Sequence, residues 1–238
     1  MKKSAFLLLS AFVFSAVFFF TSCEKPPITG DNVIEAKDVK SLSQSGLDNV
    51  DMVKAVIAFI SSTGIEVKEI ASCKFEKNGF TLTLPDNIPD NYLLSLDAYE
   101  YPGITINPKN AKQGSIEIVA YDKTENIIGA FNLASDNYFS GSSEASICGA
   151  GFSYCDRHFT IKGTLEKFPI KYNCSFKKGW NISYLKIDGK TGFFATTSKP
   201  SGVKFKWYFL EEGYLLAPKK DSCPLITHEQ IISMMPSF

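Results

Sequence analysis

The sequence is poor in the two side chains that most often bind phosphate and transfer protons. Among its 25 basic residues, Arg157 is the only arginine, and the two histidines are His158 and His228. Arginine is favoured where phosphate or carboxylate is held by two parallel hydrogen bonds. Histidine is the usual acid–base group near neutral pH. The scarcity of both argues against a dedicated phosphate site and against acid–base catalysis.

The sequence also lacks the local patterns of common catalytic and metal sites. It has no Gly-x-Ser-x-Gly, Cys-x-x-Cys or Asp-x-Asp-x-Asp-Gly spacing. Cys155, Asp156 and His158 offer a thiol, a carboxylate and an imidazole, but no second ligand pair accompanies them, and structural zinc needs four ligands. We therefore predict no catalytic residue, no metal site and no cofactor. The 25 basic and 25 acidic side chains balance, so no nucleic-acid partner is expected.

The N-terminus has the three parts of a secretory signal. Lys2 and Lys3 precede a stretch from Ala5 to Phe20 that is almost wholly apolar, and small residues follow it. The stretch is at the short edge for a membrane span, which needs about 20 apolar residues. Residues 20–23, Phe-Thr-Ser-Cys, resemble the lipobox of bacterial lipoproteins. This resemblance implies that residues 1–22 are a signal peptide and that Cys23 carries the lipid.

A lipid at Cys23 would determine where the protein resides. Two or three acyl chains hold a protein firmly on one leaflet without a membrane span. Residues 23–32 contain two prolines and read as a flexible tether. We expect a cell-envelope protein anchored through Cys23 to the outer membrane, on either its periplasmic face or the cell surface. The membrane is thus one predicted partner.

The remaining cysteines would then lie in an oxidising compartment, where disulfides form. Besides Cys23 they are an odd set: Cys73, Cys148, Cys155, Cys174 and Cys223. Cys73 and Cys174 alternate with apolar neighbours and read as inward strand positions. Cys148 and Cys155 flank a glycine-rich segment, and we predict that a disulfide between them closes a small loop.

Most of residues 33–140 read as strands. Val50 to Ile60 fits either a strand or a helix, and its β-branched residues favour the strand. Asn78-Gly79 predicts a hairpin turn before the alternating strand from Phe80 to Leu84. Residues 115–121 and 127–133 predict a second hairpin, whereas residues 135–151 read as a loop.

The second half is more regular. Turn residues separate five strand candidates at 158–165, 170–176, 181–187, 193–198 and 203–210. This spacing predicts an antiparallel meander over residues 150–215, with a C-terminal tail at 216–238. The whole chain is therefore expected to be all-β, with a β-sandwich-like unit at 33–140 and an antiparallel unit at 150–215.

Residues 68–85, with their Asn-Gly turn and Phe-x-Leu-x-Leu-Pro ending, are similar to transthyretin-like and Ig-like β-sandwiches. Together with residues 177–181 and 200–209, they make the chain resemble uncharacterised Bacteroidetes-type outer-membrane lipoproteins. The resemblance implies a compartment and a β architecture. It implies no catalytic residue, because that group has no established activity.

Aromatic residues are the strongest hint of a ligand. Trp180, Trp207 and Tyr208 could stack on sugar rings, or the tryptophans could fill the core instead. We expect a non-catalytic binding or scaffold module for a glycan or an envelope protein. The alternative is an envelope hydrolase that acts on glycans through carboxylates brought together by the fold. An exposed aromatic strip would favour glycans, and an unpaired sheet edge would favour a protein partner.

Overall fold

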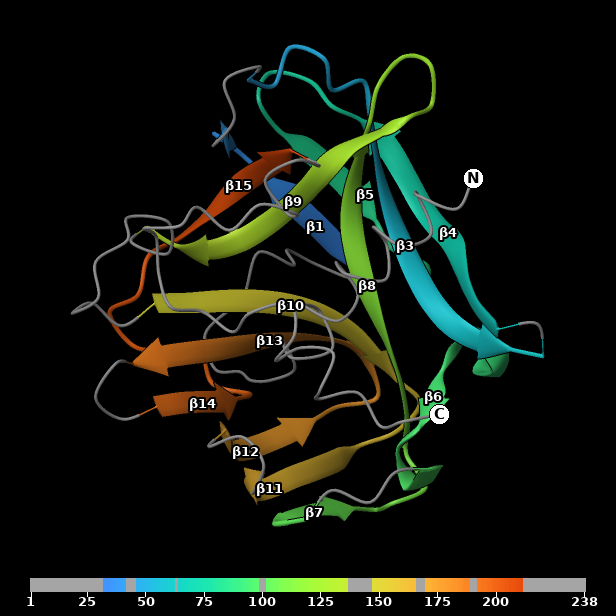
Figure 1. The fold of residues 1–238 in the computed structure, drawn as a ribbon, viewed down its shortest axis with the longest axis vertical. Coiled ribbons are helices and arrows are strands. Elements are labelled where there is room, and N and C mark those ends of the chain that lie inside the picture. The colour runs from blue at the N-terminus through green and yellow to red at the C-terminus, as the bar shows by residue number, and fades with distance from the viewer. Residues whose placement is uncertain are drawn as a thin grey trace.

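The structure is a computed structural model that describes residues 32–41, 46–62, 64–98, 102–136, 147–165, 170–188 and 192–211. Residues 1–22, Cys23 and the tail 216–238 lie outside these ranges, as does most of the tether. The all-β prediction is confirmed (Figure 1). Within the described ranges the only helical elements are two short 3-10 turns, η1 (Asp90–Tyr92) and η2 (Leu96–Ala98).

Fifteen strands make up the rest of the described fold. In chain order they are β1 (Val33–Ala36), β2 (Lys40–Ser41), β3 (Met52–Ser61), β4 (Gly64–Lys74), β5 (Phe80–Thr83), β6 (Leu94–Ser95), β7 (Ile104–Asn107), β8 (Lys112–Tyr121), β9 (Ile127–Ser135), β10 (Ile147–Cys155), β11 (Phe159–Leu165), β12 (Ile170–Phe176), β13 (Gly179–Asp188), β14 (Gly192–Thr196) and β15 (Phe205–Glu211).

Thirteen of these strands form one large sheet, in which β8 is the branch point. The main order is β2-β15-β9-β8-β10-β13-β14-β12-β11-β7, with β3, β4 and β6 attached through β8. The C-terminal part of β8 pairs with β3 and β9, while its first residues pair with β10 and β6. As a result, β3 and β4 lie at one side of the molecule and β10 to β14 cross at an angle to them (Figure 1).

The main core lies between this sheet and the small sheet of β1 and β5. Alternate residues of β3 supply Val53 and Ile57, and Ile34 and Leu82 come from the small sheet; all four are fully buried. Burying each such side chain contributes about 1.5–3 kcal/mol. Trp207, from the second predicted unit, belongs to the same core. The boundary between units 33–140 and 150–215 therefore does not coincide with a boundary of the sheet or of the core.

A second core cluster lies under β7, β11, β12 and β14. Phe159 and Phe176 are both fully buried and stack with ring centroids 4.4 Å apart. They face each other because β11 and β12 pair antiparallel, with Phe159 opposite Phe176. This cluster packs together strands at the β7 end of the sheet, and it contains Cys155 and Cys174.

Several predicted elements agree with the structure. Met52–Ser61 is a strand, and Lys112–Tyr121 and Ile127–Ser135 form the expected hairpin. All five strand candidates of the second half are strands.

Three details differ from expectation. The second half is not a simple meander, because β12 pairs in parallel with β14 and β13 pairs with β10. The glycine-rich end of the predicted loop belongs to β10, which pairs there with β9 on one edge and β13 on the other. The turn before β5 is centred on Lys77 and Asn78, which both have positive φ, while Gly79 comes after it. A β carbon on Gly79 would lie 2.3 Å from the carbonyl oxygen of Ala36.

Candidate functional site

Two of the three aromatic residues predicted to stack on a ligand are buried, which corrects that prediction. Trp207 is 4% exposed and Tyr208 is 6% exposed. The Trp207 indole Nε1 donates to the Glu35 carbonyl at 3.2 Å, and the Tyr208 hydroxyl lies 3.4 Å from the Asp136 carbonyl. The two rings do point to opposite faces of β15, but both faces are covered. They cannot form an exposed platform for sugar rings.

Trp180 is only half-buried, yet it is also held by the protein. Its Nε1 donates to the Pro85 carbonyl at 2.7 Å, and its ring meets Tyr154 edge-on with centroids 5.4 Å apart. The hydrogen bond to Pro85 holds the loop after β5 against β13. A single ring fixed in this way makes a poor glycan platform.

The predicted disulfide between Cys148 and Cys155 is wrong. Both are free thiols at opposite ends of β10. They are seven positions apart along an extended strand, a separation of about 23 Å, whereas a disulfide requires Cα atoms within about 7 Å. Cys148 packs in the main core and Cys155 in the second core. Burial raises the pKa of Cys148 to about 12 and raises that of Cys155 as well, so both thiols stay protonated.

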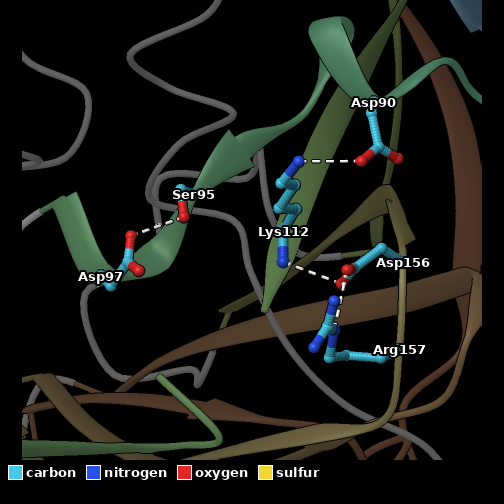
Figure 2. Close-up of polar contacts among 6 residues, drawn as sticks. All are labelled: Asp90, Ser95, Asp97, Lys112, Asp156 and Arg157. Atoms are coloured by element: carbon cyan, nitrogen blue, oxygen red, sulfur yellow. Dashed lines mark hydrogen bonds and ion pairs between the residues drawn. The ribbon is translucent and has the colours of Figure 1, made fainter. Parts of the chain in front are cut away.

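A charged cluster joins the start of β8 to two neighbouring turns (Figure 2). The Lys112 ammonium lies 2.8 Å from Asp90, and the Lys112 backbone N–H donates to Asp156 at 2.8 Å. The other Asp156 oxygen is 2.8 Å from Arg157 Nε. Ser95 donates to Asp97 at 2.5 Å nearby. This was the part of the sequence where Cys155, Asp156 and His158 suggested chemistry.

The cluster is arranged to hold segments together. Lys112 lowers the pKa of Asp90, so that carboxyl stays ionised and is unsuited to donate a proton near neutral pH. One Asp156 carboxylate oxygen accepts the Lys112 backbone N–H, and the other accepts from Arg157 Nε. The Asp156 N–H in turn donates to the Lys112 carbonyl at 3.1 Å. The geometry suits a connection between β8, η1 and the turn after β10.

A shallow groove of about 540 Å³ lies beside the turn at Lys77 and Asn78. Its lining mixes both signs of charge, with Lys37, Lys74 and Lys77 against Glu35, Asp38 and Glu76. Lys37 and Glu35 already form an ion pair at 2.7 Å. The mixture gives the groove no preference for an anion or a cation.

The most unusual surface is the outer edge of β4. In the described part of the chain, β4 pairs only with β3, and its first six residues, Gly64–Glu69, are all exposed. Ile65 is 52% exposed, Val67 is 37% exposed, and Ile60, opposite Ile65 on β3, is 48% exposed. These are the exposed large hydrophobic residues of the described ranges. We refer to Gly64–Glu69 as the open edge.

Local sequence does not show that this edge is open. Ile65 and Val67 alternate with charged neighbours, a pattern that a half-buried strand also has. A bulge at Ile70, between the pairs Ala55–Ala71 and Val56–Glu69, separates the open edge from the C-terminal part of β4. After the bulge, Ala71, Cys73 and Phe75 pack on the core. The bulge thus divides β4 into a part that packs on the core and a part that extends beyond it.

Two further features of the described ranges bear on function. None of these residues forms a group of three or more His, Cys, Asp or Glu side chains that could hold a metal ion. No helix within them is long and apolar enough to cross a bilayer. Comparison with known protein families, with curated proteins and with solved structures finds no match.

Proposed function

We propose that the chain is a lipid-anchored protein of the bacterial cell envelope that binds another protein chain by strand addition at the open edge of β4. Its role is that of a non-catalytic binding or scaffold module. The observation that carries this proposal is the open edge itself, where six consecutive strand residues are exposed. An edge of this kind offers unpaired backbone groups to an extended partner.

The apolar side chains at the same place support a protein ligand. Ile60, Ile65 and Val67 would remain in water without a partner, and each would gain from contact with apolar residues of an added strand. A glycan ligand has weaker support, because Trp207 and Tyr208 are covered. The membrane anchor at Cys23 rests on the lipobox resemblance of residues 20–23.

The anchor is tested by feeding cells an alkyne-labelled fatty acid and measuring label on the protein. We expect label on the wild-type chain and on Cys73→Ser, and none on Cys23→Ser. The mature N-terminus should be Cys23, read by mass spectrometry. Label on Cys23→Ser, or a mature chain that still contains residues 1–22, would contradict the anchor.

Strand addition is tested with a photo-crosslinking amino acid at position 65, in the intact chain in the cells that make it. Two variants are compared, Val67→Pro and Val67→Thr. The Val67 N–H points away from β3, so proline there is compatible with folding but removes a donor that an added strand needs. Threonine keeps both the donor and the branched shape.

We expect a discrete protein adduct with Val67→Thr and with the wild-type residue, and its loss with Val67→Pro. The same photo-crosslinker at Lys171 is the matched control, because Lys171 is exposed on β12, which has partners on both edges. Equal adducts at positions 65 and 171, or an adduct that survives Val67→Pro, would refute strand addition.

A further inference from the structure

The hydrogen-bonding pattern of the open edge follows from the β3–β4 hairpin. Ser61 and Gly64 close a two-residue loop, so they are a hydrogen-bonded pair, and such pairs alternate along an antiparallel ladder. Glu66 and Lys68 therefore direct their backbone groups toward β3. Ile65, Val67 and Glu69 direct theirs outward, so an added strand must bond to these three residues.

The charges on the open edge are complementary to themselves. Val67 is flanked by Glu66 and Lys68, whose side chains share one face of the strand, and all three residues are exposed. If two copies of β4 pair antiparallel about a two-fold axis at Val67, Glu66 of each copy lies opposite Lys68 of the other. Opposite charges directly across a strand pair are stabilising, and closest in the pairs that do not exchange backbone hydrogen bonds.

Both patterns select the same register. Centred on Val67, the two Val67 residues form a hydrogen-bonded pair, Ile65 bonds with Glu69 of the second copy, and the Glu66–Lys68 pairs fall at the intervening positions. An axis at Ile65 puts Lys68 opposite Ser62, and an axis at Glu69 runs into the bulge at Ile70. Glu69 adds no repulsion, since its carboxylate already lies 3.0 Å from Lys54.

We propose that the partner of the open edge is a second copy of this chain, paired antiparallel through β4 about a two-fold axis at Val67. This inference rests on the proposed strand addition and names its occupant. The pairing joins β3-β4 of each copy into one continuous sheet. On one face, Val67 of one copy lies beside Val67 of the other, and Ile60 and Ile65 extend the apolar strip on both sides.

Disulfide cross-linking tests the register in the full chain in cells. Two Val67→Cys chains would bring their new thiols together across the axis. Two Ile65→Cys chains would keep theirs about 13 Å apart along the strand, beyond disulfide reach. We expect a cross-linked dimer on a non-reducing gel for Val67→Cys, and none for Ile65→Cys or for the wild type. Ile65→Cys co-expressed with a differently tagged Glu69→Cys should give a mixed dimer.

Charge reversal tests the pairing by a route that does not depend on thiols. In the purified lipidated chain, kept in mild detergent, Glu66→Lys places two lysine pairs across the axis, and Lys68→Glu places two glutamate pairs there. We expect each variant to dimerise about tenfold more weakly than the wild type, because two favourable pairs become repulsive. A mixture of the two variants restores both ion pairs, so dimerisation should return as a heterodimer.

The outcomes separate this inference from the proposed function. Cross-linking at Val67→Cys but not at Ile65→Cys, with rescue on mixing, supports self-pairing in this register. Equal cross-linking at both positions overturns the register. A monomeric chain that still gives a Val67→Pro-sensitive adduct with a different protein overturns self-pairing and leaves strand addition standing. A monomeric chain without any such adduct overturns both.

Discussion

Phe152 and Trp207 stack with their rings parallel to within 1° and their centroids 5.8 Å apart. They come from β10 and β15, which are not adjacent, because β9 lies between them. Phe80 of the small sheet also contacts the Trp207 ring edge-on, with centroids 5.3 Å apart. Trp207 therefore joins three parts of the core that are distant in sequence.

This position predicts that Trp207 contributes to stability and not to ligand binding. Trp207→Ala should lower the free energy of unfolding by about 3–5 kcal/mol, because it removes a large buried ring and leaves the Glu35 carbonyl without its donor. Urea unfolding measures this loss. Trp180→Ala, which removes a half-buried ring, is the comparison and should cost less. A Trp207→Ala protein of unchanged stability would contradict this account.

How far the sequence predicts this fold depends on how local each signal is. The hairpin of β8 and β9 was predictable, since Asp122 and Asn126 define its turn within a few residues. The first part of β10 was missed because its glycines are compatible with a loop, and it is a strand through its pairing with β8, β9 and β13. A local pattern does not show whether a strand from elsewhere in the chain will pair with a segment.

The same limit applies to the candidate site. Residues 65–69 fall within the part of the chain expected to form strands, and they lie in β4. Whether their side chains are covered depends on how far the rest of the sheet extends, which no local pattern states. Likewise, Trp207 and Tyr208 alternate as expected for a strand, but both sides of β15 are covered by distant segments.

Cys73, Cys148, Cys155 and Cys174, the cysteines of the described ranges, should be unreactive thiols. Burial raises the pKa of Cys73 to about 11 and that of Cys148 to about 12, and it raises the pKa of Cys155 and Cys174 as well. Because the thiolate is the reactive form, alkylation of the native protein at pH 8 should be slow at all four. Half-buried Cys73 should react first. Peptide mapping by mass spectrometry measures each rate, with urea-unfolded protein as the reference. A peptide pair joined by Cys148 and Cys155 would overturn the assignment.

Asp156 and Asp90 provide a matched comparison in the charged cluster of Figure 2. The Asp156 side chain is 13% exposed and accepts the Lys112 backbone N–H, whereas the Asp90 side chain is 75% exposed and pairs with the Lys112 ammonium. Asp156→Ala should lower the free energy of unfolding by about 1–3 kcal/mol, the usual cost of a donor left without a partner. Asp90→Ala should change it little, as is typical of an exposed ion pair. Chemical denaturation of both variants measures the difference, and equal losses would argue against this division of roles.

Asp122 should give the hairpin of β8 and β9 a defined dependence on pH. Its carboxylate accepts the backbone N–H of Asn126 at 2.9 Å and the Thr124 hydroxyl at 2.8 Å, and these bonds lower its pKa from 3.8 to about 2. The folded pKa lies below the unfolded one, so the stabilisation is fully present above about pH 4 and is lost as the pH falls toward 2. The melting temperature of Asp122→Ala should therefore lie below that of the wild type at pH 7, with the gap closing between pH 4 and 2. Lys123→Ala, in the same turn but without a carboxyl, should show a gap that does not change over this range. A gap for Asp122→Ala that is equally constant would show that the ionised carboxylate does not stabilise this turn.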